Sequence, residues 1–229
     1  MRFSSLVFTA LLTLLFLMSP AYSEKVVVTD ELRTHCVEIL RTTMDEEEEW
    51  VKVHAAEHLL TLRYPKGIVE EFKKELDLYE NTPKYRIGIW RTLAKAAKNE
   101  TERAVWTHKI FAAFSDLDGE DRLHAAETLA KIYYVAKDTE IPLMKQEAES
   151  EDTVFAAFVQ CMLVHAGERK YESKLAALLS AEEVRTRQCA AYAMRFIDSV
   201  SPATYQTLLE AAEKEKAGTL AKPYLNGAA

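Results

Sequence analysis

Hydrophobic residues recur every three or four positions along most of the chain, and they never alternate with polar residues over the length of a strand. This spacing is typical of helices with one buried face. Proline, glycine and capping residues interrupt it, for example at Pro65–Gly67, Thr82–Pro83 and Ser201–Pro202. In the last two, a hydroxyl side chain precedes a proline, as at the start of many helices. The pattern predicts an all-α fold.

Five of the predicted helices share a sequence pattern that recurs about every 31 to 36 residues. Each interval holds one helix with small residues and a second helix with longer side chains. Equivalent positions in the five small-residue helices are Ala56, Trp90, Ala126, Ala157 or Phe158, and Ala191. Three of these helices have a basic residue, an alanine pair and a Leu or Met at fixed offsets. These sets are Lys52, Ala55, Ala56 and Leu59; Arg122, Ala125, Ala126 and Leu129; and Arg187, Ala190, Ala191 and Met194.

This recurring set resembles the repeats of the HEAT and HEAT-like family, including the PBS-lyase type. The resemblance implies a right-handed α–α solenoid, or superhelix, of about five helical hairpins. It also implies that the alanine-pair helices line the concave side, where partners bind. The second unit departs from the pattern, with Ile89 and Trp90 in place of the alanine pair. Tetratricopeptide repeats have a similar period, but their fixed Trp, Gly and Tyr positions do not recur here.

Four segments are predicted along the chain. Residues 1–23 have an early Arg2, an apolar run and small residues before Ser23, which is typical of a signal peptide for export. The apolar run is shorter than the ~20 residues of a membrane-spanning helix, although an uncleaved anchor is the alternative. Residues 24–44 contain an N-terminal capping helix, residues 45–217 form the repeat domain, and residues 218–229 form a tail. We therefore expect a periplasmic or secreted protein with no membrane span in its mature part.

Composition and charge exclude several classes of protein. The chain is 48% hydrophobic and has only 6 Gly and 6 Pro, which argues against a disordered or low-complexity chain. Its formal net charge is −7, and a nucleic-acid partner would favour clustered Lys and Arg instead. The densest acidic run, Asp45–Glu49, stands before a predicted helix, where the helix dipole favours carboxylates. A cation-binding patch is the alternative for that run.

Candidate catalytic motifs are weak. His54 to His58 matches the H-x-x-E-H pattern of zinc proteases. The same first four residues recur from His124 to Glu127, followed by Thr128 where the second histidine would stand. The repeat accounts for the shared part, so we predict no metal site. No nucleophile elbow, phosphate-binding glycine loop or dinucleotide fingerprint occurs in the sequence, so we also predict no cofactor and no enzyme activity.

The three cysteines leave two interpretations open. Cys161 and Cys189 fall on neighbouring predicted helices, so an oxidising compartment would allow a disulfide between them. Small buried thiols are the other interpretation. Cys36 is the third cysteine and leaves the set odd in number.

A polar stripe along the small-residue helices provides the candidate binding site. With Val51, Ala55 and Leu59 turned to the core, another face of the same helix carries polar and aromatic side chains. Together with the equivalent positions of later units, the candidate residues are Trp50, His54, Glu57, Arg91, His124 and Glu127. The alternative is a structural ladder of charges that sets the register of the stacked repeats.

The function expected from these observations is binding without chemistry. The predicted protein is an exported scaffold whose concave face binds a protein or a glycan. The alternative is a small envelope enzyme, or an accessory subunit of a carbohydrate-active enzyme, that uses the His, Glu and Arg side chains of the stripe.

Overall fold

The computed structural model describes residues 28–228, and all of its regular structure is helical. Within that range there are twelve α-helices, one short 3₁₀ helix and no strand. The predicted signal peptide lies outside the described residues. Contacts divide the chain into two units, Met1–Glu38 and Ile39–Ala229. Helix α2 (Asp30–Glu46) corresponds to the predicted capping helix and crosses this boundary.

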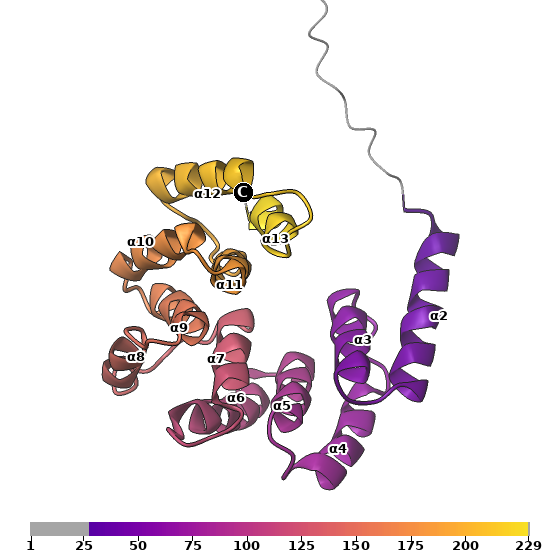
Figure 1. Ribbon diagram of the computed structural model, residues 1–229. Helices are drawn as coiled ribbons and strands as arrows, with labels where there is room; N and C mark the ends of the chain where they lie inside the picture. Colours follow the sequence, from indigo (N-terminus) through magenta and orange to yellow (C-terminus); the bar gives the residue numbers. More distant parts are fainter. Residues whose placement is uncertain (1–27, 229) are drawn as a thin grey trace, which may run out of the picture. The chain divides into compact units, whose positions relative to one another are not determined.

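The helices of the second unit follow one another with short connections (Figure 1). After α2 they are α3 (Glu49–Thr61), α4 (Ile68–Tyr79), α5 (Tyr85–Ala96), α6 (Glu100–Ser115), α7 (Arg122–Lys131), α8 (Ile141–Glu147), α9 (Thr153–His165), α10 (Lys170–Ala177), α11 (Val184–Met194), α12 (Pro202–Lys214) and α13 (Ala221–Ala228). Capping residues begin several of them: the Asn99 side chain accepts from the Glu102 amide at α6, and the Ser201 hydroxyl accepts from the Thr204 amide at α12. These local signals explain why the breaks in the pattern are helix boundaries.

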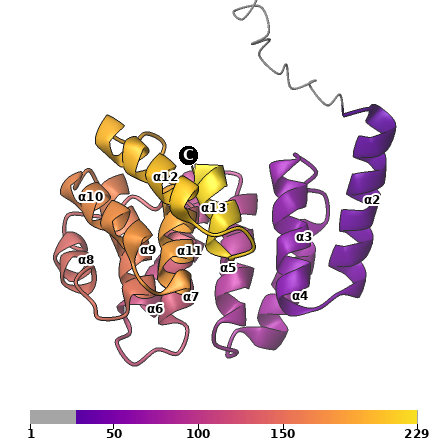
Figure 2. The ribbon, with the colours of Figure 1, turned by 45° about the horizontal axis from the view of Figure 1, so that its top comes forward.

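The helices form two layers. Helices α3, α5, α7, α9, α11 and α13 pack in series, each against the next, and we call them the inner layer (Figures 1 and 2). Helices α4, α6, α8, α10 and α12 pack against them and form the outer layer. Each predicted hairpin thus contributes one helix to each layer. The all-α helical stack predicted from the period is confirmed, while the right-handed sense of the superhelix stays a prediction.

The alanine pairs explain why the inner helices approach closely. Both alanines are buried in α3, in α7 and in α11, and Ala126, Ala190 and Ala191 are fully inaccessible. Trp90, which replaces an alanine in α5, is also buried, with Arg86 and Lys109 lying over its ring at 5.3 and 5.4 Å. The bulky residue is therefore accommodated as core, with cations shielding its outer face.

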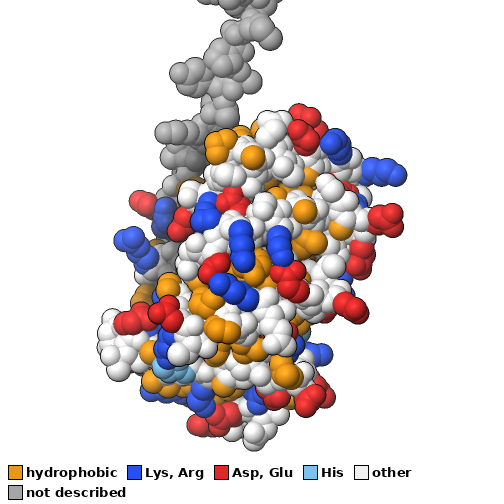
Figure 3. Space-filling model, turned by 90° about the vertical axis from the view of Figure 1, so that its left-hand side faces the viewer, with side chains coloured by type: hydrophobic (Ala, Val, Ile, Leu, Met, Phe, Trp, Pro, Cys, Tyr) orange, Lys and Arg blue, Asp and Glu red, His pale blue; other side chains and the backbone are white. Residues whose placement is uncertain are grey.

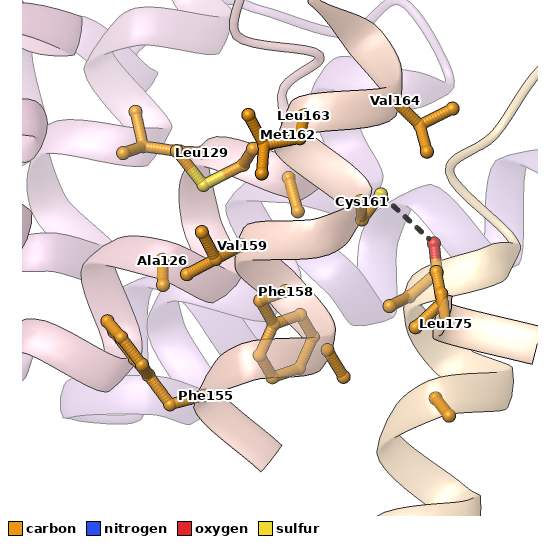
Figure 4. Packing of buried hydrophobic residues seen from close by; sticks show 14 of the residues in the cluster. Ala126, Leu129, Phe155, Phe158, Val159, Cys161, Met162, Leu163, Val164 and Leu175 are labelled. Carbon is orange, nitrogen blue, oxygen red and sulfur yellow. Dashed lines mark hydrogen bonds between the residues drawn. The ribbon is translucent and has the colours of Figure 1, made fainter. Parts of the chain in front are cut away.

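The largest hydrophobic cluster centres on α9, which is buried from Val154 to Val164. Figure 4 shows its side chains packed against Ala126 and Leu129 of α7. On the opposite side the Cys161 thiol donates to the Ala193 carbonyl at 3.4 Å (Figure 4), and burial raises its pKa. Cys36, Cys161 and Cys189 are all free thiols. Cys161 thus acts as a buried core residue, as the second interpretation of the cysteines expects.

The C-terminal segment differs from the predicted tail. Residues from Ala221 onward form α13, which packs against α11 and α12. Ala221 and Leu225 stand four residues apart on one helical face and are both fully buried. Their burial attaches the segment to the end of the inner layer, so the stack continues beyond residue 217.

The outer layer carries intermixed charges. Figure 3 shows positive and negative side chains side by side on the face formed around α8 and α10. Lys145 pairs with Glu168 at 2.7 Å, and Lys174 pairs with Glu149. These exposed pairs each contribute little to stability. Among the described helices, none combines the length and the apolar composition that crossing a membrane requires.

Candidate functional site

A buried ion pair joins the first two helices of the inner layer. Arg91 of α5 donates from Nε to Glu57 Oε1 at 3.0 Å and from Nη2 to Glu57 Oε2 at 2.9 Å. Only 2% of Arg91 and 6% of Glu57 is exposed. The two parallel hydrogen bonds match the fork of a guanidinium to a carboxylate, which is the strongest geometry for such a pair.

The same guanidinium reaches the third inner helix. Its Nη1 donates to the Thr128 hydroxyl of α7 at 3.1 Å. Arg91 thereby links its own helix α5 to both α3 and α7, and its charged end lies 5.6 Å from the centre of the Trp50 ring. A single side chain therefore sets the spacing of three successive inner helices.

Two further cations surround Glu57. Lys95 Nζ donates to its Oε1 at 3.2 Å, and Lys131 Nζ lies 3.9 Å from its Oε2. His54 Nδ1 lies 3.3 Å from Oε2. Burial alone would raise the pKa of Glu57, but the His54 hydrogen bond and the charges of Arg91, Lys131 and Lys95 outweigh it and hold the pKa well below its usual range. The Glu57 carboxylate thus faces three cationic side chains, Arg91, Lys95 and Lys131, so positive charge exceeds negative charge around it.

Trp50 fills the space above the ion pair because its neighbour is a glycine. Its ring stacks on His124 with centroids 5.6 Å apart and lies 6.2 Å from the His54 ring. A Cβ atom at Gly88 would come within 3.0 Å of both Trp50 and Val53. Gly88 occupies the repeat position of His54 and His124, and its missing side chain leaves room for the indole.

A cavity of about 420 Å³ opens beside this cluster. It is lined by side chains of α3, α7, α9, α11 and α13, and we call it the inner cavity. The residues that matter for its chemistry are His54, His124, Glu127, Lys131, Arg185, Gln188, Tyr192 and Tyr224. Glu127 and Arg185 form no hydrogen bond or ion pair with any described residue. Charges of both signs are therefore free to meet a ligand.

His124 has an uncommon environment within the inner cavity. Its Nδ1 is buried and has no hydrogen-bond partner among the described residues. Burial lowers the pKa of His124, and the charges of Lys84 and Arg91 act in the same direction, whereas Glu127 and Asp121 oppose them. His124 is therefore held in its neutral form by the fold.

The structure separates the six predicted site residues into two groups. His54, His124 and Glu127 line the inner cavity. Glu57 and Arg91 are buried beneath it, where they form the ladder contact of the alternative interpretation, and Trp50 packs between the two groups. Arg91 donates to Thr128 and not to Glu127, so Glu57 and Glu127 do not share one guanidinium.

Of the eight cavity residues named above, five were not among the sequence-based candidates: Lys131, Arg185, Gln188, Tyr192 and Tyr224. Lys131 and Tyr192 stand at positions of the polar stripe that the repeat makes equivalent to other members, so the stripe contained a signal for them. No sequence pattern pointed to Arg185 or Tyr224, because Arg185 lies at the start of its helix and Tyr224 lies in the segment predicted as a tail.

Histidine and carboxylate side chains do not gather into a metal-ligand set in the described part of the chain. Within residues 28–228, no three His, Cys, Asp or Glu side chains are grouped so that they could hold a metal ion. The Glu57 carboxylate of the H-x-x-E-H sequence is already bound by Arg91 and Lys95.

Comparison with known proteins adds no relative. No family model, no curated protein and no solved structure matches this chain. The resemblance to HEAT-like repeats therefore stays a prediction.

The fork of Arg91 can be tested by replacing it with a lysine. Arg91→Lys keeps the charge but loses the paired hydrogen bonds to Glu57 and the bond to Thr128. We expect a loss of about 2–3 kcal/mol in the free energy of unfolding, measured by urea denaturation. The matched control is Arg185→Lys, on an exposed part of α11, which should change stability by less than about 0.5 kcal/mol. Equal effects of the two variants would contradict the structural role of Arg91.

Two histidines with lowered pKa values, His124 and His165, predict that the folded protein loses stability in acid. Burial lowers the pKa of both His124 and His165 below the ordinary value of 6.5. At a pH between the folded and the unfolded pKa, the unfolded chain binds more protons than the folded chain. The contribution of these histidines to the free energy of unfolding is therefore fully present above about pH 6.5, and it is lost as the pH falls towards the folded pKa. The lowered pKa of Glu57 adds a further loss only below its ordinary value of 4.5.

This dependence is measurable by urea denaturation from pH 5 to pH 8. His124→Gln should flatten the slope between pH 6.5 and pH 5, whereas His58→Gln, on an exposed face of α3, should leave it as it is. A slope that is the same in all three proteins would show that His124 is not held neutral.

Proposed function

We propose that this protein is an exported binding scaffold that holds a segment of a partner protein in its inner cavity. The observation that carries the proposal is that five inner helices bring both charges and aromatic rings to one cavity of about 420 Å³. Helices remote in sequence converge there, as in the extended binding surfaces of repeat proteins.

The chemistry of the cavity suits a peptide segment better than a glycan. Glu127 and Arg185 present opposite charges without partners of their own, and a polypeptide can supply a cation, an anion and amide groups together. Neutral sugar hydroxyls would leave both charges unpaired. Arg and Tyr are also the residues that most often anchor protein interfaces.

The buried contacts of Arg91 beneath the cavity hold its wall rigid, which favours binding. Glu57, Arg91 and Thr128 are all buried, Arg91 donates to both of the others, and the Trp50 ring covers the guanidinium. Such preorganisation lowers the entropy lost when a partner binds. Export rests on the sequence of residues 1–23, and it would place the partner outside the cytoplasm.

One observation favours the second candidate function, an enzyme or an enzyme accessory. A neutral histidine of lowered pKa, His124, lies near the carboxylate of Glu127 within a cavity, and such pairs serve as general acids and bases in catalytic sites. Turnover of a glycan or peptide that is lost in His124→Gln, with binding retained, would favour this candidate over a pure scaffold.

The scaffold is tested by site-specific photocrosslinking in the exported fraction. A photoreactive residue at Gln188 in the inner cavity should capture one discrete protein partner, whereas the same residue at Ser173, exposed on α10, should capture none. Once the partner is purified, Arg185→Glu should weaken its affinity about tenfold, because a buried or half-buried charge pair contributes 1.4 kcal/mol or more. Lys174→Glu on the outer layer is the matched control and should leave the affinity unchanged.

Three results would count against this proposal. Equal crosslinking from Gln188 and Ser173 would place the partner elsewhere. Binding on a glycan array that Arg185→Glu abolishes would assign the cavity to a glycan. An affinity that responds alike to Arg185→Glu and Lys174→Glu would show only a general effect of charge.

A further inference from the structure

A second cavity, of about 570 Å³, lies at the C-terminal ends of α5 and α7 and the start of α6. Four of its lining residues are cationic: Lys95, Lys98, Arg103 and Lys131. The one acidic side chain in its wall is Glu100. We call it the cationic cavity, and its charge is opposite to the net charge of −7 of the whole chain.

The positive charge of this cavity is only partly neutralised inside the protein. Lys95 bonds to Glu57, but that carboxylate also receives both hydrogen bonds from Arg91. Lys131 Nζ lies 3.9 Å from Glu57, beyond hydrogen-bond distance, and no described residue accepts a hydrogen bond from it. Its side chain is nevertheless only 16% exposed. A largely buried ammonium group without an acceptor requires an anion or water in the cavity.

The surroundings of Lys131 carry too little negative charge to compensate its ammonium group. Burial lowers the pKa of Lys131, and the nearby charge of Arg91 lowers it further, while Glu57 and Glu127 only partly compensate. A bound anion would reverse this effect. The cost of holding Lys131 charged in the free protein would then be recovered when the anion binds.

The other two cations stand in fixed or accessible positions. One Arg103 nitrogen donates to the Ile132 carbonyl, which anchors the side chain from α6 to the end of α7 and leaves its remaining nitrogens free. Lys98 lies exposed in the link between α5 and α6, and its side chain has no ion-pair partner among the described residues. The four cations therefore come from four segments of the chain: α5, the link between α5 and α6, α6 and α7.

We propose that the cationic cavity binds a tetrahedral oxyanion, a phosphate or sulfate group carried on a small ligand. Donors that approach from α5, the α5–α6 link, α6 and α7 suit an anion that accepts hydrogen bonds in several directions, whereas a planar carboxylate suits a single guanidinium fork. The volume lies in the range of small-molecule sites, so there is space for the ligand beyond the anion itself. The site is separate from the inner cavity, although Lys131 contributes to both.

Titration calorimetry with the full exported chain tests this site directly. The probes are inorganic phosphate, inorganic sulfate and acetate, each against a chloride buffer of the same ionic strength. We expect saturable binding of phosphate or sulfate and none of acetate. The comparison between phosphate and sulfate identifies which ester the ligand carries.

Two variants locate the binding. Lys98→Glu, at an exposed residue, and Lys131→Met, in the cavity wall, should each weaken anion binding about tenfold or more, the effect expected when a hydrogen bond from a charged group is lost. Lys214→Glu makes the same change of charge on the exposed surface of α12 and should change the affinity by less than about twofold. Arg185→Glu, in the inner cavity, should behave like this control.

The proposal is overturned if neither anion binds more tightly than chloride at equal ionic strength, or if Lys98→Glu and Lys214→Glu weaken binding equally. Lys98→Glu keeps the test decisive even if Lys131→Met fails to fold, because the Lys98 side chain is exposed and forms no hydrogen bond or ion pair with a described residue. Since the inner cavity is tested with Arg185→Glu, the failure of either proposal leaves the other standing.

Discussion

A guanidinium buried among three helices is stable only while all three keep their places around it. Removing a charge from water costs several kcal/mol, and the cost is offset only by close, well-directed partners. Arg91 obtains these partners from Glu57 on one side and Thr128 on the other. The interaction therefore links α3, α5 and α7 more specifically than the packing of alanine pairs, which tolerates small rotations of one helix on the next.

The two cavities follow from this link. Lys131 follows Thr128 by one turn of α7 and lines both the inner and the cationic cavity, so the ion-pair cluster lies between them. On one side the cluster supports aromatic rings and charges of both signs, which suits a peptide. On the other side it leaves an excess of positive charge, which suits an oxyanion. Lys131, which lines both cavities, thus connects the two proposed sites.

Much of the fold could be predicted because the repeat is visible in the chain. The alanine pairs at Ala125 and Ala190 identify inner helices, and the prolines after Thr82 and Ser201 mark helix boundaries. The contact between Glu57 and Arg91 could also be expected from the sequence, since the two residues stand one repeat apart. The helix from Ala221 was missed because its apolar residues are few and its burial depends on α11.

The site itself was only partly predictable. A single sequence does not define the distance and rotation between helices, so it could not show that Arg91 turns to Thr128 instead of Glu127. Nor could it show that Gly88 leaves space for Trp50, a contact between different helices. Arg185 and Tyr224 reach the inner cavity only because α11 packs near α7 and α13 packs against α11, and no local sequence pattern indicates these contacts.

The most direct test of this account is a double-mutant cycle on Glu57 and Arg91, built from Glu57→Gln, Arg91→Met and the double variant, with the free energy of unfolding measured for each. If the buried pair holds the inner layer together, the two side chains should show a coupling energy of about 2 kcal/mol or more. A coupling below about 0.5 kcal/mol, the value of an exposed pair, would contradict it.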